Sequence, residues 1–453
     1  MNAARAAGGP EGLRRRLSLV GPVLLLCTAL AGCGVRVTRV YQTDTQRAVA
    51  TLSLLTDQAE AVRPLSAIAG KFHEIHPGSE IQISLLTGES NFFALLSTKF
   101  AVGDSPDLMV SQPDSDVALY AHGSYLMDIT DVARGAERRW PRPEGAFFVD
   151  SAGRAFALPL EMTSSGLLVN LDLLKRYGVV EPPRTFPEFL ADCEVLRTRG
   201  LEHPLVLAGS DGIELLQFLK QYMMENVYSS DPSFADQIVS GRRSWNSPAV
   251  RRAFAAFAEV RRCANPDALQ IGRNEAIHRF AHGDAAFAIE AGNVLRFVHR
   301  IAPNVDARLV SPPWTDRAVS GEDFLGIGSI AYASELSLRP GSVLDFLRYL
   351  SSPKIAERYA HAIGGEWPRS GGGPALDGAS LGASHAGGDV TLAGEWDPSM
   401  EWLPGFDIAF GHLVQAWYAG RGTSSVLRSL QAVQVKLART NPDFTREVIA
   451  YAE

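Results

Sequence analysis

The sequence predicts an α/β protein with parallel strands, and three observations carry this prediction. A strand pattern at 51–55 is followed by a helix pattern at 62–76 and a second strand pattern at 80–84. This order is typical of a layer of parallel strands covered by helices. Pro77-Gly78 ends the predicted helix, because proline cannot continue a helix and glycine relieves the turn. A length of 453 residues is enough for two or three lobes, each with its own core.

The next segments continue the alternation of helices and strands. We expect a helix at 91–102, a buried strand at 107–110, a helix at 117–122 closed by Gly123, and extended segments at 156–160 and 165–170. Thr185 is a good N-cap for a helix at 186–199, and Glu188 completes a capping-box pattern. Later patterns predict helices at 213–225, 248–264, 276–281 and 426–438, a strand at 285–289, and a glycine-rich surface loop at 371–388.

Composition and charge are those of an ordinary globular protein. Hydrophobic residues make up 46% of the chain and charged residues 21%, which excludes disorder as the main state. The formal net charge is −7, and no long run of lysine or arginine occurs. An acidic body without basic runs argues against nucleic acid as a partner.

The first 33 residues have the pattern of an export signal. Three arginines at 14–16 precede an apolar stretch at 17–30, which is too short to span a bilayer comfortably. The stretch ends in Leu-Ala-Gly-Cys33, which resembles a bacterial lipobox, where the cysteine thiol receives a diacylglycerol. The alternative is an ordinary secretory signal with a chance cysteine. We expect an exported, palmitate-type lipoprotein, tethered through 34–50 to the outer side of the cytoplasmic membrane, in the periplasm or at the cell surface.

Two cysteines, Cys193 and Cys263, remain in the body of the chain. An exported protein permits a disulfide, and the long loop between these residues would make the bond stabilising. Two free buried thiols on separate helices are the alternative.

Several motifs, in a fixed order, resemble the extracellular solute-binding proteins of ABC importers, the group that includes maltose-binding protein. The resemblance runs from Leu52 to the C-terminus. It rests on the segments 72–84, 100–107, 123–128, 153–159, 169–174, 182–188, 280–287, 347–353 and 364–368. Pro182-Pro-Arg-Thr-Phe-Pro-Glu188, for example, looks like the family's Pro-Pro-x-Thr-Trp-x-Glu, whereas Val169 stands where the family usually has tyrosine.

The resemblance implies a two-lobed periplasmic-binding-protein fold with a hinge and a ligand cleft between the lobes. Transferred to this chain, lobe 1 would comprise 50–160 and 325–365, and lobe 2 would comprise 161–324 and 366–453. A ligand that contacts both lobes favours the closed state. The implied function is capture of a mono- or oligosaccharide for a membrane permease by a monomer that has no cofactor and no catalytic activity.

Candidate ligand-binding residues follow from what a sugar offers, namely apolar C–H faces for aromatic rings and hydroxyls for polar side chains. Trp367 is the first aromatic candidate, in the loop 364–369, and Trp314 and Trp402 are further ones. Polar candidates come from loops expected to follow strands, where a doubly wound sheet places its ligands. They are Glu89, Asp114, Glu161, Glu290 and Asn293.

Two look-alike motifs are set aside, and alternative functions remain. His73 and His76 lie three residues apart before Pro77, which does not match the H-E-x-x-H zinc motif, so no metal is expected. The glycines at 326 and 328 precede a strand pattern rather than the helix of a dinucleotide site. A non-sugar solute (a polyamine, glycerol phosphate or a metal chelate) is the alternative ligand class, and an exported enzyme or a sensor subunit is the alternative function.

Overall fold

The computed structural model describes residues 49–86, 89–137, 149–150, 152–317, 322–323, 325–365, 391–392, 402–440 and 442. The predicted export signal, Cys33 and Trp367 lie outside the described residues. No helix of the described part of the chain is both long enough and apolar enough to cross a membrane.

The chain begins with the predicted parallel layer. Strand β1 (Ala50–Thr56) pairs in parallel with β2 (Ser79–Leu85) and with β3 (Leu108–Ser111). Helix α1 (Ala59–Ile75) connects β1 to β2 and ends just before Pro77-Gly78, as predicted. Helix α2 (Glu89–Val102) connects β2 to β3, and α3 (Ser115–His122) and α4 (Thr130–Glu137) follow.

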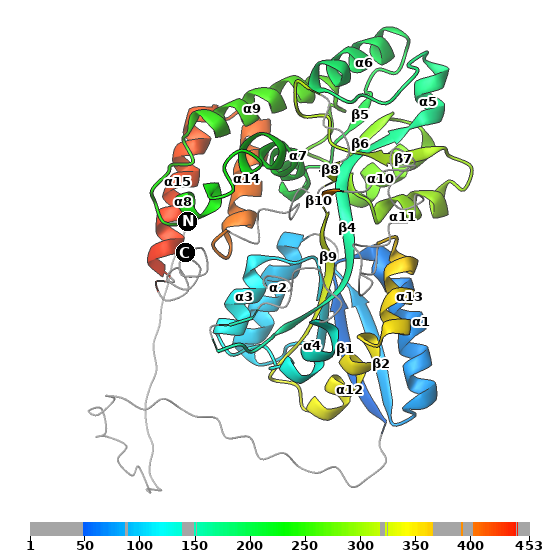
Figure 1. Cartoon of the computed structure of the whole chain (residues 1–453), viewed down its shortest axis with the longest axis vertical. Coiled ribbons are helices and arrows are strands. Elements are labelled where there is room, and N and C mark those ends of the chain that lie inside the picture. Colours follow the sequence, from blue (N-terminus) through cyan, green and yellow to red (C-terminus); the bar gives the residue numbers. More distant parts are fainter. Residues whose placement is uncertain are drawn as a thin grey trace, which may run out of the picture. The chain divides into compact units, whose positions relative to one another are not determined.

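Two long strands carry the chain between the two halves of the molecule (Figure 1). All fourteen residues of β4 (Ala157–Asn170) are buried. Along its first part β4 pairs antiparallel with β9 (Leu325–Ala333), and along its second part with β6 (Phe287–Ala291) and β7 (Ala307–Val310). The register between β4 and β9 shifts on both sides of Glu161, which is the mark of a β-bulge. The strand order is β2-β1-β3-β9-β4-β6-β5, with β7 on β4.

The second half is mostly helical. Its elements up to β6 are α5 (Leu171–Arg176), α6 (Phe186–Thr198), β5 (Leu205–Val206), α7 (Ile213–Met223), the π-helix η1 (Met224–Tyr228), α8 (Phe234–Val239), α9 (Pro248–Val260), the 3-10 helix η2 (Arg261–Cys263) and α10 (Arg273–His282). Helix α11 (Val294–Ile301) connects β6 and β7, and α14 (Phe406–Tyr418) and α15 (Thr423–Thr440) are the last helices of the described residues. A short pair, β8 (Glu322–Asp323) and β10 (Thr391–Leu392), lies apart from the main sheet.

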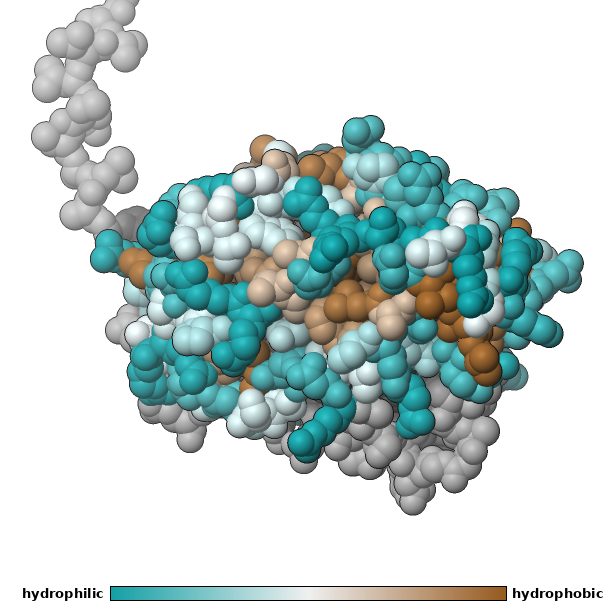
Figure 2. All heavy atoms as spheres, turned by 90° about the horizontal axis from the view of Figure 1, so that it is seen from above, coloured by the Kyte–Doolittle hydropathy of each residue, from teal (hydrophilic) through white to brown (hydrophobic). Residues whose placement is uncertain are grey.

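The buried hydrophobic residues divide into separate cores. One core spans Leu52 to Met162 and is completed by Ile327 to Ile363, which includes β9, α12 (Pro340–Leu350) and α13 (Pro353–Ile363). Two further cores are built from residues between Leu167 and Leu430. We call the residues around the first core the first lobe and those around the other two the second lobe. Figure 2 shows mainly hydrophilic residues on the face it draws, with hydrophobic residues in smaller areas between them.

The start of α6 follows its predicted cap with one difference. The Thr185 hydroxyl accepts a hydrogen bond from the Glu188 backbone N–H at 3.3 Å, which satisfies one of the free donors of the first turn. The Glu188 carboxylate accepts from the backbone N–H of Arg184 at 2.8 Å, one residue before the cap itself. These two hydrogen bonds fix the first turn of α6, the helix that carries Cys193.

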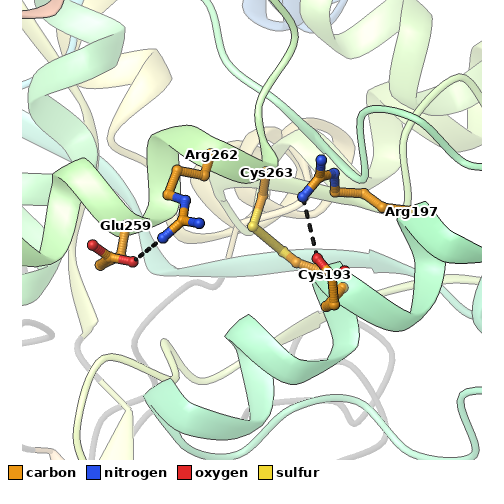
Figure 3. Close-up of a disulfide and its surroundings, with 6 residues drawn as sticks. Cys193, Arg197, Glu259, Arg262 and Cys263 are labelled. Atoms are coloured by element: carbon orange, nitrogen blue, oxygen red, sulfur yellow. Dashed lines mark hydrogen bonds and ion pairs between the residues drawn. A yellow bond between two sulfur atoms is a disulfide. The ribbon is translucent and has the colours of Figure 1, made fainter.

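The structure joins Cys193 on α6 to Cys263 in η2 by a disulfide, with the two Cα atoms 5.8 Å apart (Figure 3). Both residues are buried in the same hydrophobic core of the second lobe. Two exposed ion pairs flank the bond, Arg197 with Glu194 and Arg262 with Glu259. The bond therefore ties α6 to η2, which follows α9, through two cysteines that are 70 residues apart in sequence.

Candidate ligand-binding cleft

A polar pocket of about 560 Å³ is lined by residues of both lobes. The first lobe contributes the end of β1 and the start of α1, the first turns of α2 and the end of β3, namely Asp57, Gln58, Ala59, Asn91 and Gln112. The second lobe contributes the loop before α7, the start of α10 and α14, with Ser210, Asp211, Glu214, Arg273, Asn274 and His412 among its residues. The pocket lies at the carboxyl ends of parallel strands, where open α/β sheets place their ligands. Its volume is within the range of small-molecule sites.

Arg273 is the centre of an ion-pair network at this pocket. Its guanidinium lies 3.1 Å from Glu290 Oε2 on β6, 3.3 Å from Glu60 Oε1 on α1, and 3.9 Å from Glu214 Oε1 on α7. Burial alone would lower the pKa of Arg273, but the carboxylates of Glu290, Glu60 and Glu214 raise it well above its usual range. The Glu60 contact joins the first lobe to the second.

The carboxyl groups of the pocket have raised pKa values. Burial, and then repulsion from Glu60, raises the pKa of Asp57 to about 8. Burial also raises the pKa of Glu214 to about 8, although Arg273 opposes the shift. The Oδ1 atom of Asp57 is buried and accepts no hydrogen bond from the described residues. The pocket thus holds more carboxyl groups than its nearby positive charge compensates.

A buried polar network lies behind the first-lobe wall of the pocket. The Ser329 hydroxyl on β9 lies 2.9 Å from the side-chain oxygen of Gln58 and 3.0 Å from the Glu161 carboxylate. Gln58 also donates to the backbone oxygen of Gly328 at 2.9 Å. A Cβ atom at Gly328 or Gly365 would lie 2.1 Å from a Glu161 oxygen, so both positions must be glycine for the carboxylate to fit. The network couples a pocket residue, Gln58, to the bulge in β4.

A second cluster of buried charges lies between α3 of the first lobe and α7 and α14 of the second. Asp114 caps α3 by accepting the Asp116 backbone N–H at 2.7 Å, and Lys220 lies 3.1 Å from Asp407. Burial and repulsion from Asp116 and Asp407 raise the pKa of Asp114 well above its usual range. Burial likewise raises the pKa of Asp116 to about 6. Within the described residues, no group of three or more His, Cys, Asp or Glu side chains is arranged to hold a metal ion.

None of the polar residues predicted for the site is among the residues that line the pocket, but three of them lie near residues that do. Glu290 pairs with Arg273, Glu161 lies behind Gln58, and Asp114 caps the helix that follows β3. Glu161 and Glu290 were expected to follow strands, but Glu161 lies within β4 and Glu290 within β6. Each of these strands extends further than its hydrophobic pattern indicates.

Two further polar residues differ from their predicted setting. Glu89 was expected in a loop, and the structure places it at the start of α2. Asn293 follows β6 as expected; it is buried, and its backbone N–H donates to the Thr163 hydroxyl at 3.1 Å.

The structure places the two described tryptophans of the predicted site in the core of the second lobe. Trp314 is 1% exposed, its ring packs against Phe189 and Phe218, and its indole N–H donates to Gln221 at 2.8 Å. Trp402 is 2% exposed and packs in the same core. Neither ring lines the pocket, and ligand contact by any of the predicted residues stays a prediction.

Sequence reasoning missed most of the pocket residues. Asp57 and Gln58 directly follow the first predicted strand, so the rule that places ligands after parallel strands was sufficient to find them. Arg273 precedes the predicted helix at 276–281, and nothing in the local pattern indicates that α10 begins three residues earlier and brings its first turn to the cleft.

Comparison with known proteins places the fold and the family. The model of bacterial extracellular solute-binding proteins matches residues 56–357. The melibiose/raffinose/stachyose-binding protein MelE of Bacillus subtilis is 23% identical over 352 residues, which cover 75% of this chain and 78% of MelE. A chitin oligosaccharide binding protein superimposes with a TM-score of 0.71 at 18% identity, covering 86% of this chain and 98% of that one.

A sugar transporter protein of Bacillus licheniformis, solved in complex with stachyose, has a TM-score of 0.68 at 19% identity and covers 86% of this chain and 100% of that one. These structures share the two-lobed fold of maltose-binding protein type. The family match covers well over half of the chain, so this protein belongs to the bacterial extracellular solute-binding proteins.

Proposed function

We propose that this protein is the lipid-anchored, substrate-binding component of an ABC importer and that it captures a saccharide between its lobes. The observation that carries the proposal is the polar pocket, to which both lobes contribute side chains. A ligand held there contacts both lobes at once, and only such a ligand favours the closed state over the open one. The sugar-binding relatives of the same family support a saccharide as the solute.

The described lining favours a neutral or cationic solute over an anionic one. Arg273 is the only lysine or arginine among the described residues of the pocket, and three carboxylates already surround it. A phosphate ester needs several unengaged positive groups. This argues against glycerol phosphate, which was one of the alternative solutes.

The hinge of this proposal lies in the crossing strands. Strand β4 belongs to both halves of the sheet and pairs along its first part with β9, and the register shift at Glu161 interrupts this pairing. An interrupted ladder bends more readily than a regular one, and bulges locally increase strand twist. Ligand release to a permease would then follow from bending at this point.

The lipid anchor depends on Cys33. Replacing Cys33 by alanine should move the protein from the membrane fraction to the soluble exported fraction, and Cys27→Ala is the matched control. Equal membrane retention in both variants would remove the anchor from the proposal.

Thermal-shift screening of the purified protein tests the function itself. Neutral mono- and oligosaccharides, amino sugars, polyamines and phosphate esters are compared, and product analysis of each oligosaccharide tests for hydrolysis. A saccharide that raises the Tm without turnover is the expected result. Stabilisation by phosphate esters or polyamines alone, or turnover of a glycoside, would contradict the proposal.

A further inference from the structure

We infer that the saccharide of this cleft carries a protonated amine, the chemistry of an amino sugar. The inference rests on the proposed function and names the class of saccharide. Three features of the described pocket carry it: the lack of aromatic plates, the excess of carboxyl groups, and the position of these groups on both lobes.

The described lining offers no aromatic face for a neutral sugar. None of its residues is a Trp, Tyr or Phe, and His412 is its single ring. Stacking on aromatic rings is the usual way for a protein to hold the apolar faces of a neutral sugar. The binding energy that the described lining supplies must therefore come mainly from polar and charged contacts.

Carboxyl groups in the pocket outnumber the positive charge. Asp57, Asp211, Glu214 and Glu275 all line it. Glu275 lies 2.9 Å from Arg279, whereas Arg273, the one guanidinium of the described lining, is within ion-pair distance of Glu60, Glu290 and Glu214. The buried Oδ1 of Asp57 accepts no hydrogen bond from the described residues. The raised pKa values of Asp57 and Glu214, both about 8, have the same cause, namely burial without enough opposite charge.

The carboxyl groups face the pocket from opposite lobes. Asp57 follows β1 in the first lobe, and Asp211 and Glu214 lie at the start of α7 in the second. An ammonium group between them would favour their deprotonated forms. It would then form charge-assisted hydrogen bonds to both lobes, which are stronger than bonds between neutral groups. The amine would thus help to close the cleft as well as to select the ligand.

The remaining lining fits hydroxyl groups. Asn91, Gln112 and Asn274 each offer an amide that both donates and accepts, and Ser210 offers a hydroxyl. A simple polyamine carries no hydroxyl or carbonyl group and would leave this part of the lining without partners. An amino group on a polyhydroxyl ring matches both parts of the pocket.

Calorimetric titration of the purified full-length protein with matched ligands tests the inference. Glucosamine is compared with glucose, the β-1,4-linked glucosamine dimer with cellobiose, and spermidine serves as the polyamine probe. At pH 7 we expect the amine of at least one pair to bind about 10-fold or more tightly than its neutral counterpart, as a hydrogen bond to a charged group allows. Asp57→Asn should reduce this preference to about threefold or less.

Asp131→Asn is the matched control, because Asp131 lies on α4 with its side chain 87% exposed, and it should keep the preference. If Asp57→Asn does not fold, Glu214→Gln provides the same comparison from the other lobe. Equal or tighter binding of the neutral sugars would overturn the amino-sugar inference and leave the saccharide function intact. Binding of none of the four sugars would overturn the amino-sugar inference alone, and binding of spermidine alone would overturn both.

Discussion

Replacing Glu60 by glutamine should weaken ligand binding although Glu60 does not line the pocket. Glu60 lies on α1 of the first lobe and is 2% exposed, and its Oε1 lies 3.3 Å from Nη1 of Arg273 on the second lobe. The ion pair requires the two lobes to be close together. It therefore stabilises the closed state and contributes nothing to an open one.

The structure sets the size of the effect. Removing one partner of a buried ion pair costs about 3–5 kcal/mol when the other charge is left uncompensated. Arg273 keeps Glu290 at 3.1 Å, so the loss is closer to that of a single charged hydrogen bond. We expect about 1–2 kcal/mol, which corresponds to about a 5- to 30-fold lower ratio of closed to open protein and a similar loss of affinity.

Calorimetry measures the affinity, and small-angle scattering measures the closed fraction with and without ligand. Glu74→Gln on the same helix is the matched control, because Glu74 is 61% exposed and pairs only locally with Lys71. Unchanged affinity in Glu60→Gln, together with an unchanged scattering radius, would refute the role of this ion pair in closure.

Three further predictions follow. Cys193→Ala with Cys263→Ala should cost roughly 4 kcal/mol of unfolding free energy, from the loop of about 70 residues; a urea midpoint equal to that of the oxidised protein would contradict this. Trp314→Ala should cost about 3–5 kcal/mol by emptying a core site, and a small loss of stability would show that the packing account fails. The pKa values of Asp57 and Glu214 are about 8 in the folded protein but about 4 in the unfolded chain, so between these pH values the folded protein binds more protons. The free energy of unfolding should therefore fall as the pH rises from about 4 to about 8. Urea titrations should show a smaller fall in Asp57→Asn.

Much of the fold was predictable because its signals are local. The first strand, helix and second strand are marked by hydrophobic period and by Pro77-Gly78, and the structure has them within a few residues of the predicted bounds. Helices α12, α13 and α14 are also amphipathic, but the residues alone did not predict them. One motif of the resembled family, 347–353, covers the end of α12 and the first residue of α13.

The site was harder to predict because its residues come together only through tertiary structure. Arg273 is central to the site because it forms ion pairs with Glu60 and Glu290. These residues lie on different elements from Arg273 and are separated from it in sequence. Trp314 and Trp402 look like cleft residues in sequence because they occur in loops. A loop residue can still be buried, and here the packing of α6, α7 and α14 covers both rings.

The position of β9 sets an order for folding after export. In the sheet, β9 lies between β3 and β4, yet it comes from residues 325–333, after most of the second lobe. The first lobe therefore lacks the strand that joins β3 to β4 until that segment has crossed the membrane. The N-terminal part of the chain emerges first. Strands β1 to β4 then stay without β9, and one edge of β3 stays unpaired, until more than 150 further residues have emerged. Chaperones that shield exposed strand edges would matter most during that interval. A chain truncated before residue 325 should aggregate rather than yield a half-sized binding protein.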